Sequence, residues 1–147
     1  MGLVPPCFHT PLRVEKVAGT ARDWRVYESL VFESCLLHGF VVLPAGVIIN
    51  FASVPRGLWN LLPPTGFYDF GTALHDGSYR AQLVTLAGHP MHLIRELCDK
   101  LLLEACEATG VCEHERWLLY HGVRVGGGSS YHGLGDAAEL DEACYAH

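Results

Sequence analysis

One short stretch of the chain holds the residues best suited to chemistry, an adjacent His75-Asp76 pair followed by Tyr79. If this stretch is helical, His75 and Tyr79 lie one turn apart on the same face, and Asp76 points in another direction. Imidazole titrates near neutral pH, so a histidine can serve as a general base. The spacing therefore indicates a polar site on one face of a helix.

A further acid, Asp99, lies in an otherwise apolar run at residues 97–103. An unpaired carboxylate is costly to bury, so Asp99 needs a hydrogen-bonding partner if it faces the core. His75 and Tyr79 are the nearest partners by residue type. We therefore expect two antiparallel helices in which Asp99 accepts hydrogen bonds from an imidazole and a phenol.

This trio has two interpretations, which the sequence leaves open. In the first, His75, Tyr79 and Asp99 form a buried polar network that pins two helices together. In the second, they form an active site in which Asp99 fixes the tautomer of His75. The other ring nitrogen of the imidazole then takes a proton from water.

Composition restricts the class of protein. The chain has 147 residues, of which 50% are apolar and 18% charged, which is enough for one folded domain with a core. Its formal net charge of -6 argues against nucleic acid as a partner. No apolar run reaches the roughly 18 residues of a membrane span, and the N-terminus lacks the pattern of a signal peptide. We therefore expect neither feature.

The elements that must position the trio fall into two groups. Alternating β-forming residues predict strands in the first half of the chain, and helical periodicity predicts helices in the second half. The predicted strands are 24–32, 35–43 and 47–49, and the predicted helices are 68–80, 91–109 and 113–123. The predicted fold class is therefore α+β, a small N-terminal antiparallel sheet followed by about three helices.

Proline and glycine set the predicted domain limits. Residues 1–23 are expected to be an extended N-terminal arm, 24–126 a single domain, and 127–147 a flexible Gly-rich tail. Within the domain, Ser53 is expected to cap a short helix that has Pro55 in its first turn. Gly77 is a poor helix former, so we expect it to let a neighbouring helix approach closely. The six cysteines form no C-x-x-C pair and are expected to be reduced and mostly buried.

Several linked motifs resemble one known family. In chain order they are Pro44-Ala-Gly46, Ala52-Ser-Val-Pro-Arg56, His75-Asp76 with Tyr79, Asp99, and Tyr120-His-Gly-Val123-Arg124-Val-Gly126. Over about residues 24–126 this pattern resembles a family of small, mostly bacteriophage and prophage proteins of unknown function. The family's usual Thr-Asp before the Ala-Ser-Val-Pro-Arg segment is Ile49-Asn50 here, followed by Phe51. If that acid serves a metal or catalysis in relatives, Asn50 argues against activity in this chain.

The resemblance implies a function. It implies a phage-encoded structural or accessory protein, such as a component of the virion tail or head, that binds other phage proteins. Such a protein would be present in the host cytoplasm during assembly and then in the virion, and homo-oligomers are compatible with it. No cofactor is expected under this interpretation.

A weaker resemblance implies an alternative. The H-D-x-x-Y helix with its distant Asp is similar to the core of secretory phospholipases of the A-two type. By that resemblance His75 is the base, Asp99 its orienter, Tyr79 a supporting donor and Asp76 a calcium ligand. The chain would then be a calcium-dependent hydrolase of membrane lipid in phage entry or lysis. Residues 64–68 match that family's glycine-rich calcium loop poorly, and the net charge offers little attraction to anionic lipid.

Arginines supply the remaining candidate. Arg56 and Arg124 are candidates for binding a phosphate or carboxylate group, because a guanidinium group matches the shape of both anions, and Arg56 is the predicted binding residue. The ordinary alternative is an ion pair between Arg56 and an acid such as Asp69 or Asp76.

Overall fold

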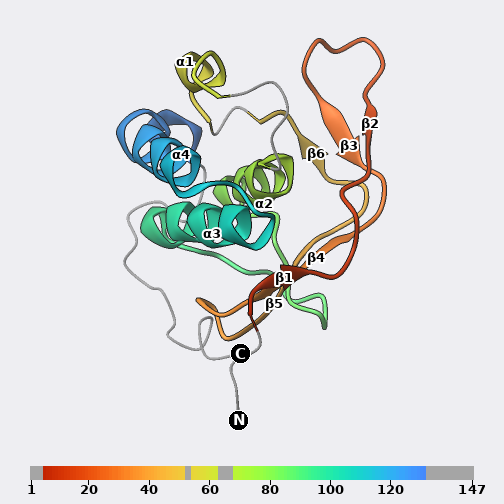
Figure 1. The fold of residues 1–147 in the computed structure, drawn as a ribbon. Coiled ribbons are helices and arrows are strands. Elements are labelled where there is room, and N and C mark those ends of the chain that lie inside the picture. The colour runs from red at the N-terminus through yellow and green to blue at the C-terminus, as the bar shows by residue number, and fades with distance from the viewer. Residues whose placement is uncertain (1–4, 52–53, 63–67, 132–147) are drawn as a thin grey trace.

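The computed structural model describes residues 5–51, 54–62 and 68–131, and it is drawn as a ribbon in Figure 1. Short strands come first and helices follow, so the predicted α+β class is confirmed. The strands are β1 (Cys7–Phe8), β2 (Val14–Lys16), β3 (Trp24–Val26), β4 (Leu30–Ser34), β5 (Gly39–Leu43) and β6 (Ile48–Ile49). The helices are α1 (Arg56–Trp59), α2 (Asp69–Tyr79), α3 (Arg95–Ala108) and α4 (Glu113–Gly126), followed by a 3-10 turn, η1 (Gly128–Ser130).

The strands form two antiparallel sheets rather than the single predicted one. Their orders are β1-β4-β5 and β2-β3-β6. The predicted strand 24–32 is interrupted by bends at Tyr27 and Glu28, which send β3 and β4 into different sheets. The predicted strand 35–43 begins too early, because a turn that contains His38 with a positive φ of 55° precedes β5.

Residues 5–23, predicted as an extended arm, contribute a strand to each sheet. Strand β1 pairs with β4, and β2 pairs with β3. Both strands are only two or three residues long. Residues 1–4 and 132–147, and with the latter most of the predicted tail, lie outside the described part of the chain.

The three long helices lie side by side, and β2 and β3 project away from them (Figure 1). Contacts between α2 and α3 run in opposite directions along the two helices. Gly71 faces Cys106, His75 bonds to Asp99, and Tyr79 bonds to Arg95. The helices are therefore antiparallel, as predicted. All three predicted long helices are present, with ends that differ by a few residues, and α1 is the short helix predicted near Pro55.

The core explains why two glycines occur within α2. A Cβ atom on Gly77 would lie 2.5 Å from Cδ1 of Leu43 in β5. The absence of a side chain at Gly77 therefore lets strand β5 pack closely against α2. The prediction that Gly77 faces a neighbouring helix is therefore wrong. Gly71 has that function instead, because a Cβ atom there would lie 2.7 Å from Sγ of Cys106 in α3.

Three smaller predictions concern caps, cysteines and membrane spans. Pro55 occupies the N-cap of α1 rather than its first turn, and Ser53 lies outside the described residues.

The five described cysteines are free; Cys98 and Cys106 are buried, and Cys112 is exposed. Within the described ranges, no helix is both long enough and apolar enough to cross a membrane.

Candidate functional site

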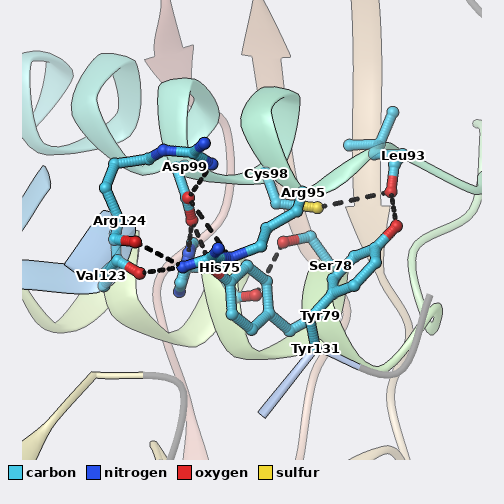
Figure 2. A network of polar contacts seen from close by, with 10 residues as sticks. All are labelled: His75, Ser78, Tyr79, Leu93, Arg95, Cys98, Asp99, Val123, Arg124 and Tyr131. Carbon is cyan, nitrogen blue, oxygen red and sulfur yellow. Dashed lines mark hydrogen bonds and ion pairs between the residues drawn. The ribbon is translucent and has the colours of Figure 1, made fainter. Parts of the chain in front are cut away.

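The structure brings His75, Tyr79 and Asp99 into direct contact (Figure 2). His75 Nε2 lies 2.7 Å from Oδ1 of Asp99, and the Tyr79 hydroxyl donates to the same oxygen at 2.6 Å. The imidazole and phenol rings are 4.1 Å apart, as expected for residues one helical turn apart. The predicted contacts of Asp99 are therefore confirmed.

Helix packing buries this trio completely. The side chains of His75 and Asp99 have no exposed surface, and Tyr79 is equally buried. Residues 71–79 of α2 are all buried, because this helix contacts α3 on one side and residues of β5 and β6 on another. A buried carboxylate requires hydrogen-bonding partners, and the two donors from α2 provide them.

Two arginines extend the network to α4. Arg124 donates from Nη1 to Oδ2 of Asp99 at 2.8 Å. Arg95, one turn before Asp99 on α3, donates from Nε to the Tyr79 hydroxyl at 3.2 Å. Its Nη2 donates to the carbonyl oxygens of Val123 at 2.6 Å and Arg124 at 2.8 Å, near the end of α4. One connected network therefore joins α2, α3 and α4.

Electrostatics agree with an ionised Asp99. Burial alone would raise the pKa of Asp99, but hydrogen bonds from His75, Tyr79 and Arg124 bring it below its ordinary value. Burial raises the pKa of Tyr79, and its hydrogen bond to Asp99 raises it further, so the phenol stays protonated. The hydrogen bond to Asp99 also raises the pKa of Arg124. The network is thus a buried carboxylate stabilised by neutral and cationic donors.

Asp76, the predicted calcium ligand, lies outside this network. Its Oδ2 accepts a hydrogen bond from the backbone N–H of Asn50 at 3.1 Å, and Nε of Arg80 lies 3.7 Å away. Arg80 also donates to the carbonyl of Ile48, so Asp76 and Arg80 together attach α2 to β6. Calcium prefers six to eight oxygen ligands, whereas the described groups around Asp76 include a guanidinium and an amide N–H. The described surroundings of Asp76 do not fit a calcium site.

Arg56 lines a surface pocket of about 510 Å³ between α1 and the β2-β3-β6 sheet. Within the described part of the chain, six of the ten lysines and arginines form ion pairs with carboxylates. Three of the other four, Lys16, Arg22 and Arg56, line this pocket, together with aromatic residues that include Trp24 and Trp59. The alternative prediction was an ion pair between Arg56 and an acid such as Asp69 or Asp76. No ion pair of Arg56 occurs among the described residues, and Asp76 lies 3.7 Å from Arg80 instead. The pocket is suited to an anionic group.

Sequence reasoning overlooked Arg95 and assigned no protein partner to Arg124. Arg95 lies four residues before Asp99, a spacing that brings two helical side chains together and was the available signal. The sequence marks Arg124 as a candidate for binding a phosphate or carboxylate group, and in the structure Arg124 donates to the carboxylate of Asp99. No spacing rule in the sequence identifies this contact between α3 and α4.

Comparison with known proteins places the chain in a family. A family model described as a protein of unknown function (DUF1353) matches residues 24–123. The chain belongs to this family. The DUF1353 match includes His75, Asp76, Tyr79 and Asp99 but ends one residue before Arg124, and it begins after β1 and β2. No curated protein and no solved structure matches the chain.

Proposed function

We propose that this DUF1353 protein is a phage-encoded structural or accessory protein, a component of the virion tail or head, that acts by binding other phage proteins. The observation that carries the proposal is the complete burial of His75 and Asp99. A general base must reach the proton that it removes, either directly or through one water. A histidine with no exposed surface, bonded to an equally buried carboxylate, is better suited to holding helices together.

The network has the properties of a structural element. Both oxygens of Asp99 are engaged, Oδ1 by His75 and Tyr79 and Oδ2 by Arg124. Arg95 adds bonds to Tyr79 and to the end of α4. Fully satisfied polar networks hold packed elements in one specific arrangement. Under this proposal the network holds the scaffold, and partner binding takes place at the surface.

The Arg56 pocket supports a binding role. Its three cations are not paired with carboxylates in the described chain, although the protein as a whole carries a net charge of -6. Guanidinium groups recognise carboxylates in a bidentate way, and aromatic walls bury apolar surface. An acidic segment of a partner protein, carrying an apolar residue, has the matching chemistry. The protein would act in the host cytoplasm during assembly and in the virion.

Charge reversal at the pocket tests this role. The full chain would be co-expressed with the other structural proteins of its phage and purified, as wild type, as Arg56→Glu, and as the matched control Arg13→Glu. Arg13 forms an exposed ion pair with Glu28 and does not line the pocket. We expect a phage protein to co-purify with wild type and Arg13→Glu but not with Arg56→Glu. Equal recovery with all three chains would contradict the proposal.

One observation favours a second candidate, a hydrolase that uses His75 as its base. The contacts of Asp99 with His75 and Tyr79 match the arrangement in which a carboxylate orients a catalytic histidine. Catalysis would require a motion that exposes His75. The test is hydrolysis of phosphatidylglycerol vesicles by wild type and His75→Gln, with and without calcium, beside the thermal unfolding of both proteins. Turnover that disappears in a normally stable His75→Gln would favour the hydrolase. We expect no turnover and a lower unfolding temperature for the variant.

A further inference from the structure

Three metal-ligating side chains meet at β1, the edge strand of the β1-β4-β5 sheet, and none belongs to the His75 network. Cys7 Sγ and His9 Nε2 are 3.4 Å apart, and the same nitrogen lies 2.9 Å from Oε2 of Glu33. All three ligand atoms lie within 4.8 Å of one another. We propose that Cys7, His9 and Glu33 bind a divalent transition-metal ion, and that zinc matches their chemistry best.

The strand pairing explains why these residues converge. Residues two apart in a strand point to the same side, so Cys7 and His9 share one face of the sheet. Cys7 is directly opposite Glu33 in the β1–β4 ladder, and the N–H of His9 continues this pairing by donating to Val31. Between them Phe8 points the other way, and its ring contacts Phe32 and Phe70. The apolar face of β1 thus anchors the strand and turns the three ligands outward.

The distances are close to those of a tetrahedral site. Zinc bonds of about 2.3 Å to sulfur and 2.0–2.1 Å to nitrogen or oxygen place neighbouring ligand atoms roughly 3.3–3.6 Å apart. The Cys7–His9 distance of 3.4 Å is already in this range, and the His9–Glu33 distance of 2.9 Å must open by a few tenths of an ångström. The side chains of His9 and Glu33 are 44% and 25% exposed, so both have room for this adjustment.

The donor set selects the kind of ion. Thiolate, imidazole and carboxylate are the ligands that zinc takes from proteins, whereas calcium and magnesium prefer oxygen alone. A hydrogen bond to Cys7 and an ion pair with Glu33 both meet at Nε2 of His9, so one nitrogen holds a sulfur and an oxygen ligand beside it. On binding, the Cys7 thiol releases its proton to solvent and the thiolate bonds to the metal. Three protein ligands leave a fourth position for water or a further ligand.

Cobalt, a spectroscopic substitute for zinc, provides the test. The reduced full chain would be treated with a chelator, desalted, and titrated with Co²⁺ and then Zn²⁺. We expect about one equivalent of Co²⁺ to bind, with a thiolate-to-cobalt absorption band in the near ultraviolet, and Zn²⁺ to abolish that band. Cys7→Ser should lose the band, and Glu33→Gln should weaken metal binding at least tenfold.

Matched variants separate this site from others. Cys112→Ser removes the exposed thiol at the start of α4, and it should bind cobalt as the wild type does. Circular dichroism of each variant would verify that its fold is unchanged. An unchanged absorption band in Cys7→Ser, equal losses in Cys7→Ser and Cys112→Ser, or no band at one equivalent of Co²⁺ would each overturn the proposal.

Discussion

Arg124 Nη1 lies 2.8 Å from Oδ2 of Asp99, and this contact brings α4 into a network otherwise built by α2 and α3. Oδ1 of the same carboxylate holds His75 and Tyr79. A single acid on α3 therefore has partners on the two helices that flank it. Asp99 is thus the common partner of His75, Tyr79 and Arg124.

Removal of the Arg124 guanidinium should weaken the fold. Arg124→Met leaves Oδ2 of a fully buried carboxylate without its cationic donor, and hydrogen bonds to charged groups contribute about 1.5–3 kcal/mol. We expect the free energy of unfolding in urea to fall by roughly that amount. The control Arg13→Met breaks an exposed ion pair with Glu28 and should cost less than about 1 kcal/mol. If both variants lost the same free energy of unfolding, the contact between Arg124 and Asp99 would stabilise the fold no more than an exposed ion pair does.

Stability should depend on the ionisation of Asp99 in acid. Because the pKa of Asp99 is lower in the folded chain than its ordinary value of about 3.9, this group's contribution is fully present above that pH. The contribution is lost as the pH falls through the lower, folded pKa. We expect the wild-type free energy of unfolding to decrease as the pH falls below about 4.

Variants assign that slope to one residue. Asp99→Asn should be less stable at neutral pH and should show a shallower decrease in acid, measured by urea unfolding at several pH values. Glu28→Gln, which removes a carboxylate from an exposed ion pair, should retain the wild-type slope. If the free energy of unfolding of Asp99→Asn fell as steeply in acid as that of the wild type, other carboxylates would be the cause of the acid dependence.

The glycines of α2 should not tolerate a methyl group. Gly71→Ala places a Cβ atom 2.7 Å from Cys106 Sγ, and Gly77→Ala places one 2.5 Å from Leu43 Cδ1. Overpacking of this kind costs about 1–3 kcal/mol, which exceeds the gain of up to about 1 kcal/mol in helix propensity. Gly57→Ala in α1 meets no atom within 4 Å and should be neutral or stabilising. Thermal unfolding of the three variants would contradict this account if all three were stabilised alike.

The sequence predicts the helices and the Asp99 contacts because these depend on local periodicity and on the cost of burying an acid. A carboxylate in an apolar run needs donors, and His75 and Tyr79 are the donors spaced for one helical face. The contact between Arg124 and Asp99 depends on how α4 crosses α3, which no local pattern encodes. The division into two sheets depends on bends at Tyr27 and Glu28. Tyrosine and glutamate also occur within strands, so these residue types do not indicate a bend.

Gly77 shows the same limit in another way. Its presence in a helix correctly indicates a close neighbour, but the neighbour is Leu43 of β5 rather than a helix. Cys7 and His9 match no metal-binding motif in the sequence, because Glu33, which lies beside them in the structure, belongs to another strand. Local sequence patterns thus identify residues that have close neighbours, but the tertiary fold determines which residues those neighbours are.

The most direct test of a structural role for the network is a double-mutant cycle between His75 and Asp99. Free energies of unfolding in urea would be measured for wild type, His75→Phe, Asp99→Asn and the double variant. Each single change leaves a buried partner unsatisfied, so we expect losses of about 3–5 kcal/mol. The double variant should lose less than the sum by roughly 1–3 kcal/mol. Additive losses within about 0.5 kcal/mol, or single variants as stable as wild type, would contradict the structural account and return His75 to the candidates for catalysis.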